Sequence, residues 1–448
     1  MSRRQDRTQL RPGNFEIFLS PIFEDTCHYG VAAYSIAAIR SLSTTCRRFY
    51  EEDHSRNGEN GKLDANCRTE EEVNSNQALA GGRLTQITSM KAHFNPNIFL
   101  IIKDSGIIVW DFEKHNQYLL ASDYAHRLLK IAYTQSFDPR GDSIDMELQN
   151  ENLVSNKPFV EPPWGWDILS RIFHLGTKDI PQDVNPKDGV EWATNYIRTC
   201  HETLQHKIPV FRQREFPVVI PLEKPSTSIL ENCTLWQALS SRRTCRQFRK
   251  ETVSKEKFGS ILYASFGFMK DREQEINEFV PDELRQRRSS PSGGGLNSSE
   301  IYIWCHQVES LDPGIYHYNP ENHSLALVRT LKNMESLSSL LAGQYFSENL
   351  AFGAFIASRF DRMWWKYGHS RAYRVSLLDI GHLSQTFQLA SSAVGLNTWL
   401  SAAFKDSEVE KILGIDTLDE QVLLFVGSGY SNGGDMDPIS QTLLGKQQ

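Results

Sequence analysis

Runs of β-branched and aromatic residues mark a group of strands near residue 100. Residues 97–103 and 107–111 are two such runs, and the turn-forming sequence Asp-Ser-Gly separates them. This arrangement predicts a β-hairpin. A third short strand is expected at residues 117–120.

Helical patterns follow these strands. Ser122 is a candidate N-cap for an apolar-periodic helix over residues 123–132, and two further helices are expected at residues 166–175 and 186–206. Three strands followed by three helices indicate a small winged-helix-like unit. Residues 208–224 contain several prolines and are interpreted as a linker.

The second half of the chain alternates helices and strands without βαβ regularity, which predicts an α+β fold. Its longest helix is expected at residues 377–394, ending at Gly395, and Ser254 is the candidate cap of an amphipathic helix over residues 254–268. A short helix is expected at residues 236–241, and strands at residues 301–305, 314–318, 324–328, 351–358 and 421–426.

The length of 448 residues allows about three domains. We place them at residues 1–94, 95–206 and 207–448. The first segment contains a polar stretch at residues 51–82, which is interpreted as a long loop or a disordered insertion. It shows no clear strands, so a winged-helix-like unit there would be a degenerate one.

Charge and cysteine content narrow the class of protein. The 48 basic and 55 acidic residues leave a net charge of −7, and residues 132–206 contain no basic recognition helix, which disfavours nucleic-acid binding. The seven cysteines form no Cys-x-x-Cys pair, so we expect neither a disulfide framework nor a metal site. The basic start lacks the apolar stretch of a signal peptide, and no apolar run is long enough to cross a membrane. We therefore expect a protein of the reducing cytoplasm.

A basic segment follows the helix expected at residues 236–241. It contains Arg242, Arg243, Thr244 and Arg246. Guanidinium groups with a hydroxyl can bind a phosphate, although a solvated basic patch is the more common explanation for such residues alone. Cys245 has no base near it in the sequence and is expected to be a buried structural thiol.

Two other segments carry candidate chemistry. The glycine-rich loop at residues 291–295 would let backbone amides approach a flat ring or a phosphate, but a flexible linker has the same composition. Lys366 and Tyr367 follow two tryptophans. Lysine beside tyrosine offers two groups that can move protons once burial or a neighbouring cation lowers their pKa. An ordinary loop anchored by aromatic residues is the alternative.

Taken together and in this order, these segments resemble the FMN-dependent nitroreductase superfamily, and in particular its branch that dehydrogenates azoline rings in ribosomal peptides. Residues 242–248 are similar to the opening phosphate-binding motif. The azoline branch is matched by residues 291–303, 313–318, 366–367, 378–385 and 394–397. The resemblance covers residues 230–430. The N-terminal extension most resembles that of the cyanobactin oxidases, where winged-helix units recognise peptides.

The resemblance implies roles for individual residues. Arg242, Arg243 and Thr244 match positions that hold the FMN phosphate and ribityl chain, and Arg246 matches the position near the flavin N1/O2 edge. After Gly427 the basic phosphate contact usual in the superfamily is missing, so the phosphate site is incomplete by this comparison.

The remaining matches concern the flavin ring and the chemistry. The loop lying against the ring, which in this superfamily often comes from the partner subunit, is matched by Pro291, Ser292, Gly293 and Gly294. Ala402 and Ala403 lie in the segment whose backbone approaches flavin N5. Lys366 and Tyr367 match the catalytic pair of the azoline branch.

The implied reaction is an FMN-dependent oxidation of thiazoline or oxazoline rings in a ribosomally made precursor peptide, with molecular oxygen reoxidising the flavin. Tyr367 is favoured as the base with Lys366 lowering its pKa, and the reverse order stays open. A homodimer is expected. An extended leader peptide could add a strand beside residues 97–103 or 107–111. The alternatives are an NAD(P)H-dependent nitro or quinone reductase, and a leader-peptide-binding protein whose flavin domain is inactive.

Overall fold

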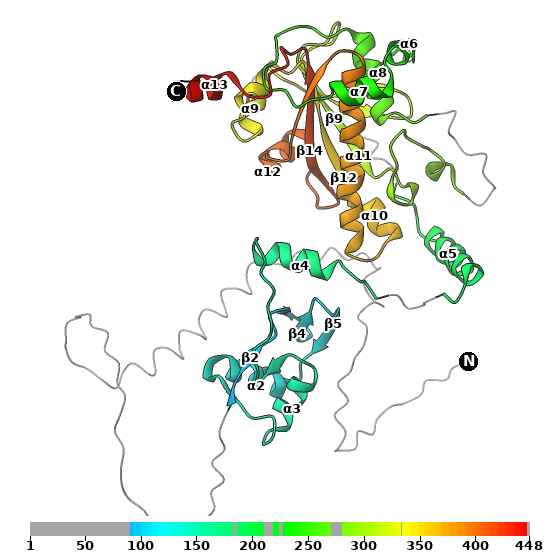
Figure 1. Cartoon of the computed structure of the whole chain (residues 1–448). Helices are drawn as coiled ribbons and strands as arrows, with labels where there is room; N and C mark the ends of the chain where they lie inside the picture. Colours follow the sequence, from blue (N-terminus) through cyan, green and yellow to red (C-terminus); the bar gives the residue numbers. More distant parts are fainter. Residues whose placement is uncertain are drawn as a thin grey trace, which may run out of the picture. The chain divides into compact units, whose positions relative to one another are not determined.

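A computed structural model of the chain describes residues 90–181, 186–209, 218–223, 227–269, 280–332 and 334–445. These residues fall into two compact units, which divide the chain at residues 1–176 and 177–448. The segment expected at residues 1–94, with its polar stretch, lies outside the described residues except for its last five positions. Figure 1 shows the described elements in chain order.

The first unit contains a three-stranded antiparallel sheet in the order β3-β4-β5. β3 (Ile98–Lys103) pairs with β4 (Gly106–Asp111), and Gly106 adopts a φ of 129° directly after the turn, a conformation that favours glycine. β5 (Asn116–Leu119) lies on the other side of β4. The hairpin and the third strand predicted from the sequence are therefore confirmed.

β4 is the middle strand of this sheet, so both of its edges are paired. A leader-peptide strand beside residues 107–111 is therefore a wrong expectation, since the backbone groups it would need already bond to β3 and β5. Within this three-stranded sheet, β3 and β5 are the outer strands, and each has one edge that is not paired with another strand of the sheet.

The helices of the first unit are α2 (Ser122–Thr134), α3 (Ser143–Asn150) and α4 (Ile168–Gly176). Ala121 rather than Ser122 holds the N-cap position of α2 and makes no side-chain cap hydrogen bond, so the predicted cap is wrong. The sequence analysis missed α3, which begins after Asp142, a residue that accepts hydrogen bonds from two backbone amides. Two short antiparallel pairs complete the unit: β1 (Met90–Lys91) with β6 (Ser136–Phe137), and β2 (His93–Phe94) with β7 (Val154–Ser155).

The second unit is built on a seven-stranded antiparallel sheet in the order β13-β14-β12-β9-β10-β11-β8. The strands are β8 (Val219–Pro221), β9 (Ser299–Cys305), β10 (Gly314–Asn319), β11 (Ser324–Thr330), β12 (Phe352–Arg359), β13 (Asn397–Ser401) and β14 (Glu420–Gly429). Five of them were predicted. β8 lies in the segment interpreted as a linker, and β13 was not predicted at all. Together with the helices, the sheet confirms the α+β class.

Helices cover both faces of this sheet. α8 (Lys255–Phe266) and α11 (Arg371–Ala393) contribute to one apolar core, in which Phe266 and Phe387 stack with ring centroids 5.7 Å apart. α9 (Leu337–Leu340) and α12 (Asp406–Leu413) pack into a second core around Trp399. The predicted Ser254 cap of α8 is confirmed, since its side chain accepts a hydrogen bond from the Lys257 amide. In Figure 1, α7 and α10 lie at opposite ends of α11.

The other elements of this unit are α5 (Gly189–Leu204), α6 (Thr227–Glu231), α7 (Leu235–Ser241), α10 (Phe360–Lys366) and α13 (Pro438–Gly445), with 3₁₀ turns η2 (Asp282–Leu284), η3 (Gly293–Gly295) and η4 (Tyr345–Asn349). We expected α5 to belong with residues 95–206, but it contacts α10 instead. The unit boundary accordingly falls after Gly176. None of the helices in the described ranges is long and apolar enough to span a membrane.

Candidate functional site

The candidate catalytic pair lies at the end of α10. This helix follows β12 directly, and its first turn is buried, with Arg362 at 1% and Met363 at 2% exposure, while its last turn is partly exposed. Lys366 is the final helical residue, and Tyr367 is the C-cap, whose amide donates to the Met363 carbonyl. The buried first turn thus fixes the helix and leaves the lysine and the tyrosine at its accessible end.

The pair faces the glycine-rich loop. Lys366 Nζ donates to the Gly294 carbonyl over 3.4 Å. Gly294 has a φ of 61°, and a Cβ placed on it would lie 2.5 Å from Tyr367 Oη and 3.1 Å from Lys366 Nζ. Gly294 and the Lys366–Tyr367 pair, more than seventy positions apart in the sequence, are therefore brought together, and the close approach requires glycine.

Asp379 on α11 holds this loop in place. Its carboxylate accepts a hydrogen bond from Ser292 Oγ at 2.8 Å and from the Gly293 amide at 3.0–3.1 Å. Burial raises the pKa of Asp379, and the hydrogen bonds from Ser292 and Gly293 act against that increase. A Cβ on Gly293 would lie 2.3 Å from Val375, also on α11, so the loop packs too closely on this helix for any larger residue.

Arg362 ties the same loop to α10. Its Nε and Nη2 donate to the Leu296 carbonyl at 3.1 and 2.8 Å. The guanidinium is buried, and burial lowers its pKa. Since Lys366 lies one turn further along the helix, this contact sets the position of the loop relative to the candidate pair. Arg362 was not indicated by any sequence pattern, and Asp379 was indicated only as part of the matched segment 378–385, without a role, because each acts on a segment more than sixty residues away.

The electrostatics around Tyr367 differ from the expectation. Lys366 Nζ lies 5.6 Å from the centre of the Tyr367 ring. Nevertheless the pKa of Tyr367 is raised, first by burial and then by Cys200 and Asp379. In this structure the neutral phenol is therefore favoured, and the expected lowering by Lys366 does not outweigh burial.

The basic segment begins at the other end of α11. Arg242 is the C-cap of α7, and its Nη1 reaches Gln388 Oε1 over 3.4 Å. Gln388 follows Asp379 by nine residues, which corresponds to about 13 Å along the helix axis. Within one chain, the arginines and the glycine-rich loop are thus not brought together, since each contacts a different part of α11.

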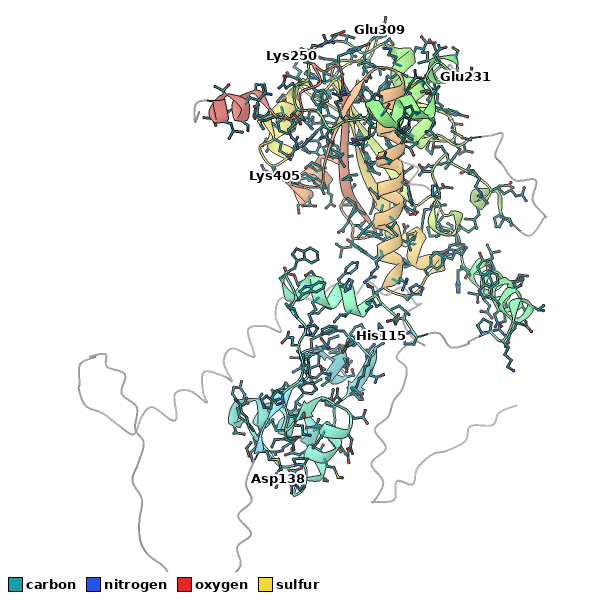
Figure 2. All side chains as sticks on the ribbon, in the orientation of Figure 1. His115, Asp138, Glu231, Lys250, Glu309 and Lys405 are labelled. Carbon is teal, nitrogen blue, oxygen red and sulfur yellow. The ribbon has the colours of Figure 1, made fainter. Side chains whose placement is uncertain are left out.

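The basic side chains of this segment also diverge from one another. Arg246 Nη1 donates to the Asp435 carbonyl at 2.6 Å, beyond the last strand. Arg249 forms an exposed ion pair with Glu251 at 3.1 Å. Figure 2 shows the exposed Lys250 at the same end of the unit as Glu309. Arg249 is the cation of this segment for which an ion pair is seen among the described residues, and Arg242, at the end of α7, contacts the Gln388 amide instead.

β13 connects the remaining candidates. Thr244 forms a parallel bridge with Thr398, and the Cys245 amide donates to the Thr398 carbonyl at 2.9 Å. Ala402 and Ala403 follow the end of the same strand and are exposed. Cys245 is fully buried, and burial raises its pKa, as expected of a structural thiol. The strand that the sequence analysis missed thus carries one candidate group at each end.

Comparison with known proteins shows which family the same part of the chain resembles. Residues 239–430 match the model of the Nitroreductase family, and every candidate site residue lies within that range. The trifolitoxin-processing protein TfxB of Rhizobium leguminosarum bv. trifolii is 26% identical over 285 residues, covering 61% of this chain and 72% of that protein. The microcin B17-processing protein McbC of Escherichia coli is 30% identical over 163 residues, covering 34% of this chain and 58% of that protein. Among solved structures, the E. coli microcin synthetase McbBCD complex with truncated pro-MccB17 bound has a TM-score of 0.36 and 22% identity, covering 59% of this chain and 92% of that one.

Proposed function

Residues 239–430 match the model of the Nitroreductase family, and from that match we propose that this chain is an FMN-dependent oxidase acting on a ribosomally made peptide. It converts thiazoline or oxazoline rings of the precursor to thiazole or oxazole, with molecular oxygen as the final electron acceptor. Two relatives are named for processing trifolitoxin and microcin B17. The observation that carries the proposal is the placement of Lys366 and Tyr367 against Gly294, since a dehydrogenation needs a proton-moving group beside the surface that holds the ring.

The side chains present fit a bound FMN. Arg242 and Arg243 supply guanidinium donors suited to a phosphate, with Thr244 and Arg246 next to them in the chain. A flat ring could approach the backbone of Gly293 and Gly294 closely because these residues have no side chain, and Pro291, Ser292, Ala402 and Ala403 would line the ring. The chemistry that FMN supplies when bound is acceptance of the hydride that leaves the azoline ring.

Aromatising an azoline removes a proton from the ring carbon beside the C=N bond and a hydride from the adjacent carbon. The Tyr367 phenolate would take the proton at Oη and become the neutral phenol, and the Lys366 ammonium would stabilise the phenolate before this transfer. The phenolate of a tyrosine is a minor species at neutral pH, and burial raises the pKa of Tyr367 and makes that fraction smaller still. The rate should therefore rise with pH.

A homodimer would complete the site. In one chain the arginines and the loop contact parts of α11 that are about 13 Å apart, so a second copy could bring the loop of one chain to the arginines of the other. The contacting helices α7 and α11 both expose large apolar residues, with Trp236 at 75% and Leu378 at 62% exposure. Trp236→Glu with Leu378→Glu should give a monomer in analytical ultracentrifugation.

The first unit would bind the leader peptide. β3 has an outer edge and exposes two apolar residues, Leu100 at 46% and Ile102 at 82%. An extended peptide could add to this edge by backbone hydrogen bonding and use these side chains for specificity. Ile102→Asp should then weaken leader binding in a fluorescence titration, without affecting FMN content. The winged-helix-like nature of the unit is part of this proposal.

Cellular location follows from cysteine chemistry. The four cysteines in the described part of the second unit (Cys200, Cys233, Cys245 and Cys305) are free. Free thiols persist in a reducing compartment, so we place the protein in the cytoplasm.

A thiazoline-containing peptide incubated with the purified protein in air tests the main proposal. Mass spectrometry should show the loss of two hydrogens from the peptide, and Lys366→Ala should abolish this loss while FMN stays bound. Bleaching of the yellow protein by NAD(P)H without any peptide would instead favour a nitro or quinone reductase. A purified protein without flavin absorbance that still binds the leader would favour a peptide-binding role with an inactive flavin domain.

A further inference from the structure

α5 lies outside the segment that matches the nitroreductase family, yet it is attached to the candidate site. Directly after α5, the His206 carbonyl accepts a hydrogen bond from Trp365 Nε1 at 3.3 Å. Three residues further on, the Pro209 carbonyl accepts one from Arg362 Nη1 at 2.6 Å. The two donors lie on α10, so these contacts fasten the end of α5 to the helix that carries the candidate pair.

This attachment places an aromatic ring beside Lys366. The Nζ atom lies 5.8 Å from the centre of the Tyr196 ring on α5 and 5.6 Å from the centre of the Tyr367 ring. An ammonium within about 6 Å of an aromatic centroid is attracted by the ring quadrupole. Lys366 therefore contacts two tyrosine rings, and its third contact is the Gly294 carbonyl at 3.4 Å.

Neighbours on α5 hold the Tyr196 ring in turn. Trp192, one turn earlier, stacks on it with centroids 5.4 Å apart and an interplanar angle of 3°. Cys200, one turn later, is its hydrogen-bond partner, and that bond is the main cause of the raised pKa of Tyr196. No residue of α5 is buried. Core packing therefore does not explain the contacts of Tyr196 with Trp192 and Cys200.

We propose that Tyr196 is a positioning residue that holds the Lys366 ammonium against Tyr367, so that α5 completes the active site from outside the nitroreductase domain. The role in catalysis rests on the proposed function of Lys366. Without the Tyr196 ring, the lysine side chain has one aromatic contact fewer and samples more rotamers, so it stands less often beside the phenol.

Two substitutions at position 196 test this role. Tyr196→Leu removes the ring, whereas Tyr196→Phe keeps the ring and removes the hydroxyl that meets Cys200. Tyr133→Leu, at an 87% exposed tyrosine on α2, is the matched control. Since α5 has no buried residue and Tyr133 on α2 is itself exposed, all three variants should fold, which circular dichroism verifies. Tyr196→Met serves if the Tyr196→Leu variant does not fold.

The first measurement does not depend on the reaction. Lysines of the full-length protein are reductively methylated with ¹³C, and the Lys366 signal is assigned by its loss in Lys366→Arg. Ring currents should shift that signal upfield relative to exposed lysines, and Tyr196→Leu should reduce the shift while Tyr196→Phe and Tyr133→Leu preserve it. A signal that Tyr196→Leu does not move would overturn the proposal.

The second measurement is turnover of a thiazoline peptide. Tyr196→Leu should lower kcat roughly tenfold with little change in KM, and Tyr196→Phe should stay near the wild-type kcat. If Tyr196→Leu moves the Lys366 signal but leaves kcat unchanged, the positioning role is overturned, and Tyr196 only contacts Lys366. If the wild-type protein shows the shifted signal but no turnover, the proposed function fails while the contact with Tyr196 stands.

Discussion

Adding one methyl group at Gly294, by the substitution Gly294→Ala, should lower the activity strongly while the protein still folds. The glycine has a φ of 61°, a left-handed conformation that costs an alanine about 1–2 kcal/mol. The added Cβ would also lie 2.5 Å from Tyr367 Oη. Gly294→Ala should therefore lower the free energy of unfolding through backbone strain and also displace Tyr367, the candidate base.

The displacement sets the expected loss of activity. To reach an ordinary contact of 3.4 Å, Tyr367 Oη must move by about 0.9 Å, and Lys366 Nζ, at 3.1 Å, must also shift. A misplacement of about 1 Å in a reacting group costs on the order of 100-fold in rate, or about 2.7 kcal/mol of barrier. We expect Gly294→Ala to lower kcat for thiazoline oxidation by about that factor.

Gly395→Ala is the matched control. Gly395 ends α11 with a φ of 77°, and a Cβ there would meet nothing within 4 Å. Both variants should lose about 1–2 kcal/mol in urea unfolding, because both force alanine into the left-handed region. Only Gly294→Ala should lose activity.

The assay compares kcat, KM and FMN content of both variants with those of the wild type. Wild-type turnover in Gly294→Ala would refute the placement of Tyr367 at the reacting ring. An equal loss of turnover in Gly395→Ala would show that backbone strain, rather than the clash, is responsible. Loss of FMN in Gly294→Ala alone would assign the glycine to cofactor binding instead of positioning the base.

Three further predictions concern charge and hydrogen bonding. The pKa of Tyr367 lies above its usual value of 10, so the fraction of phenolate increases with pH throughout the range below it. The value of kcat/KM should therefore rise about tenfold per pH unit up to at least pH 9. A plateau below pH 8 would exclude Tyr367 as the base. Arg243→Gln should weaken FMN binding by roughly tenfold or more in a fluorescence titration, whereas Arg249→Gln, which loses only an exposed ion pair, should not. Asp379→Ala leaves the Ser292 hydroxyl and the Gly293 amide without their acceptor and should cost about 1–3 kcal/mol in urea unfolding, while Asp379→Asn, which keeps one acceptor oxygen, should cost less.

Local pattern was sufficient for many elements. The hairpin around Gly106, the Ser254 cap and the end of the long helix at Gly395 each depend on a few neighbouring residues, and all three are as predicted. Short or exposed elements were missed, because β13 has only five residues and α3 only eight. Ser122 shows the limit of cap prediction. A serine side chain favours the N-cap position, but Ser122 is the first residue of α2 and Ala121 is the N-cap.

Residue identity alone also supplied the candidate chemistry. The sequence indicated the glycine-rich loop and the Lys366–Tyr367 pair. The structure places the pair in contact with Gly294 of that loop. The sequence contained no indication of Arg362 or Tyr196, and it placed Asp379 in a matched segment without a role. The partners of these three residues lie between 66 and 170 positions away in the chain. A hydrogen bond or a ring contact of that span leaves no trace in local periodicity.

The sequence by itself determined the strands and helices whose patterns are local, the α+β class and the residue types that can move a proton or bind a phosphate. Only the tertiary structure decided that α5 joins the second unit, that the arginines and the glycine-rich loop contact different parts of α11, and that burial raises the pKa of Tyr367. The physical reason is that distance and burial arise from packing between segments far apart in the chain, whereas propensity and capping act between neighbours.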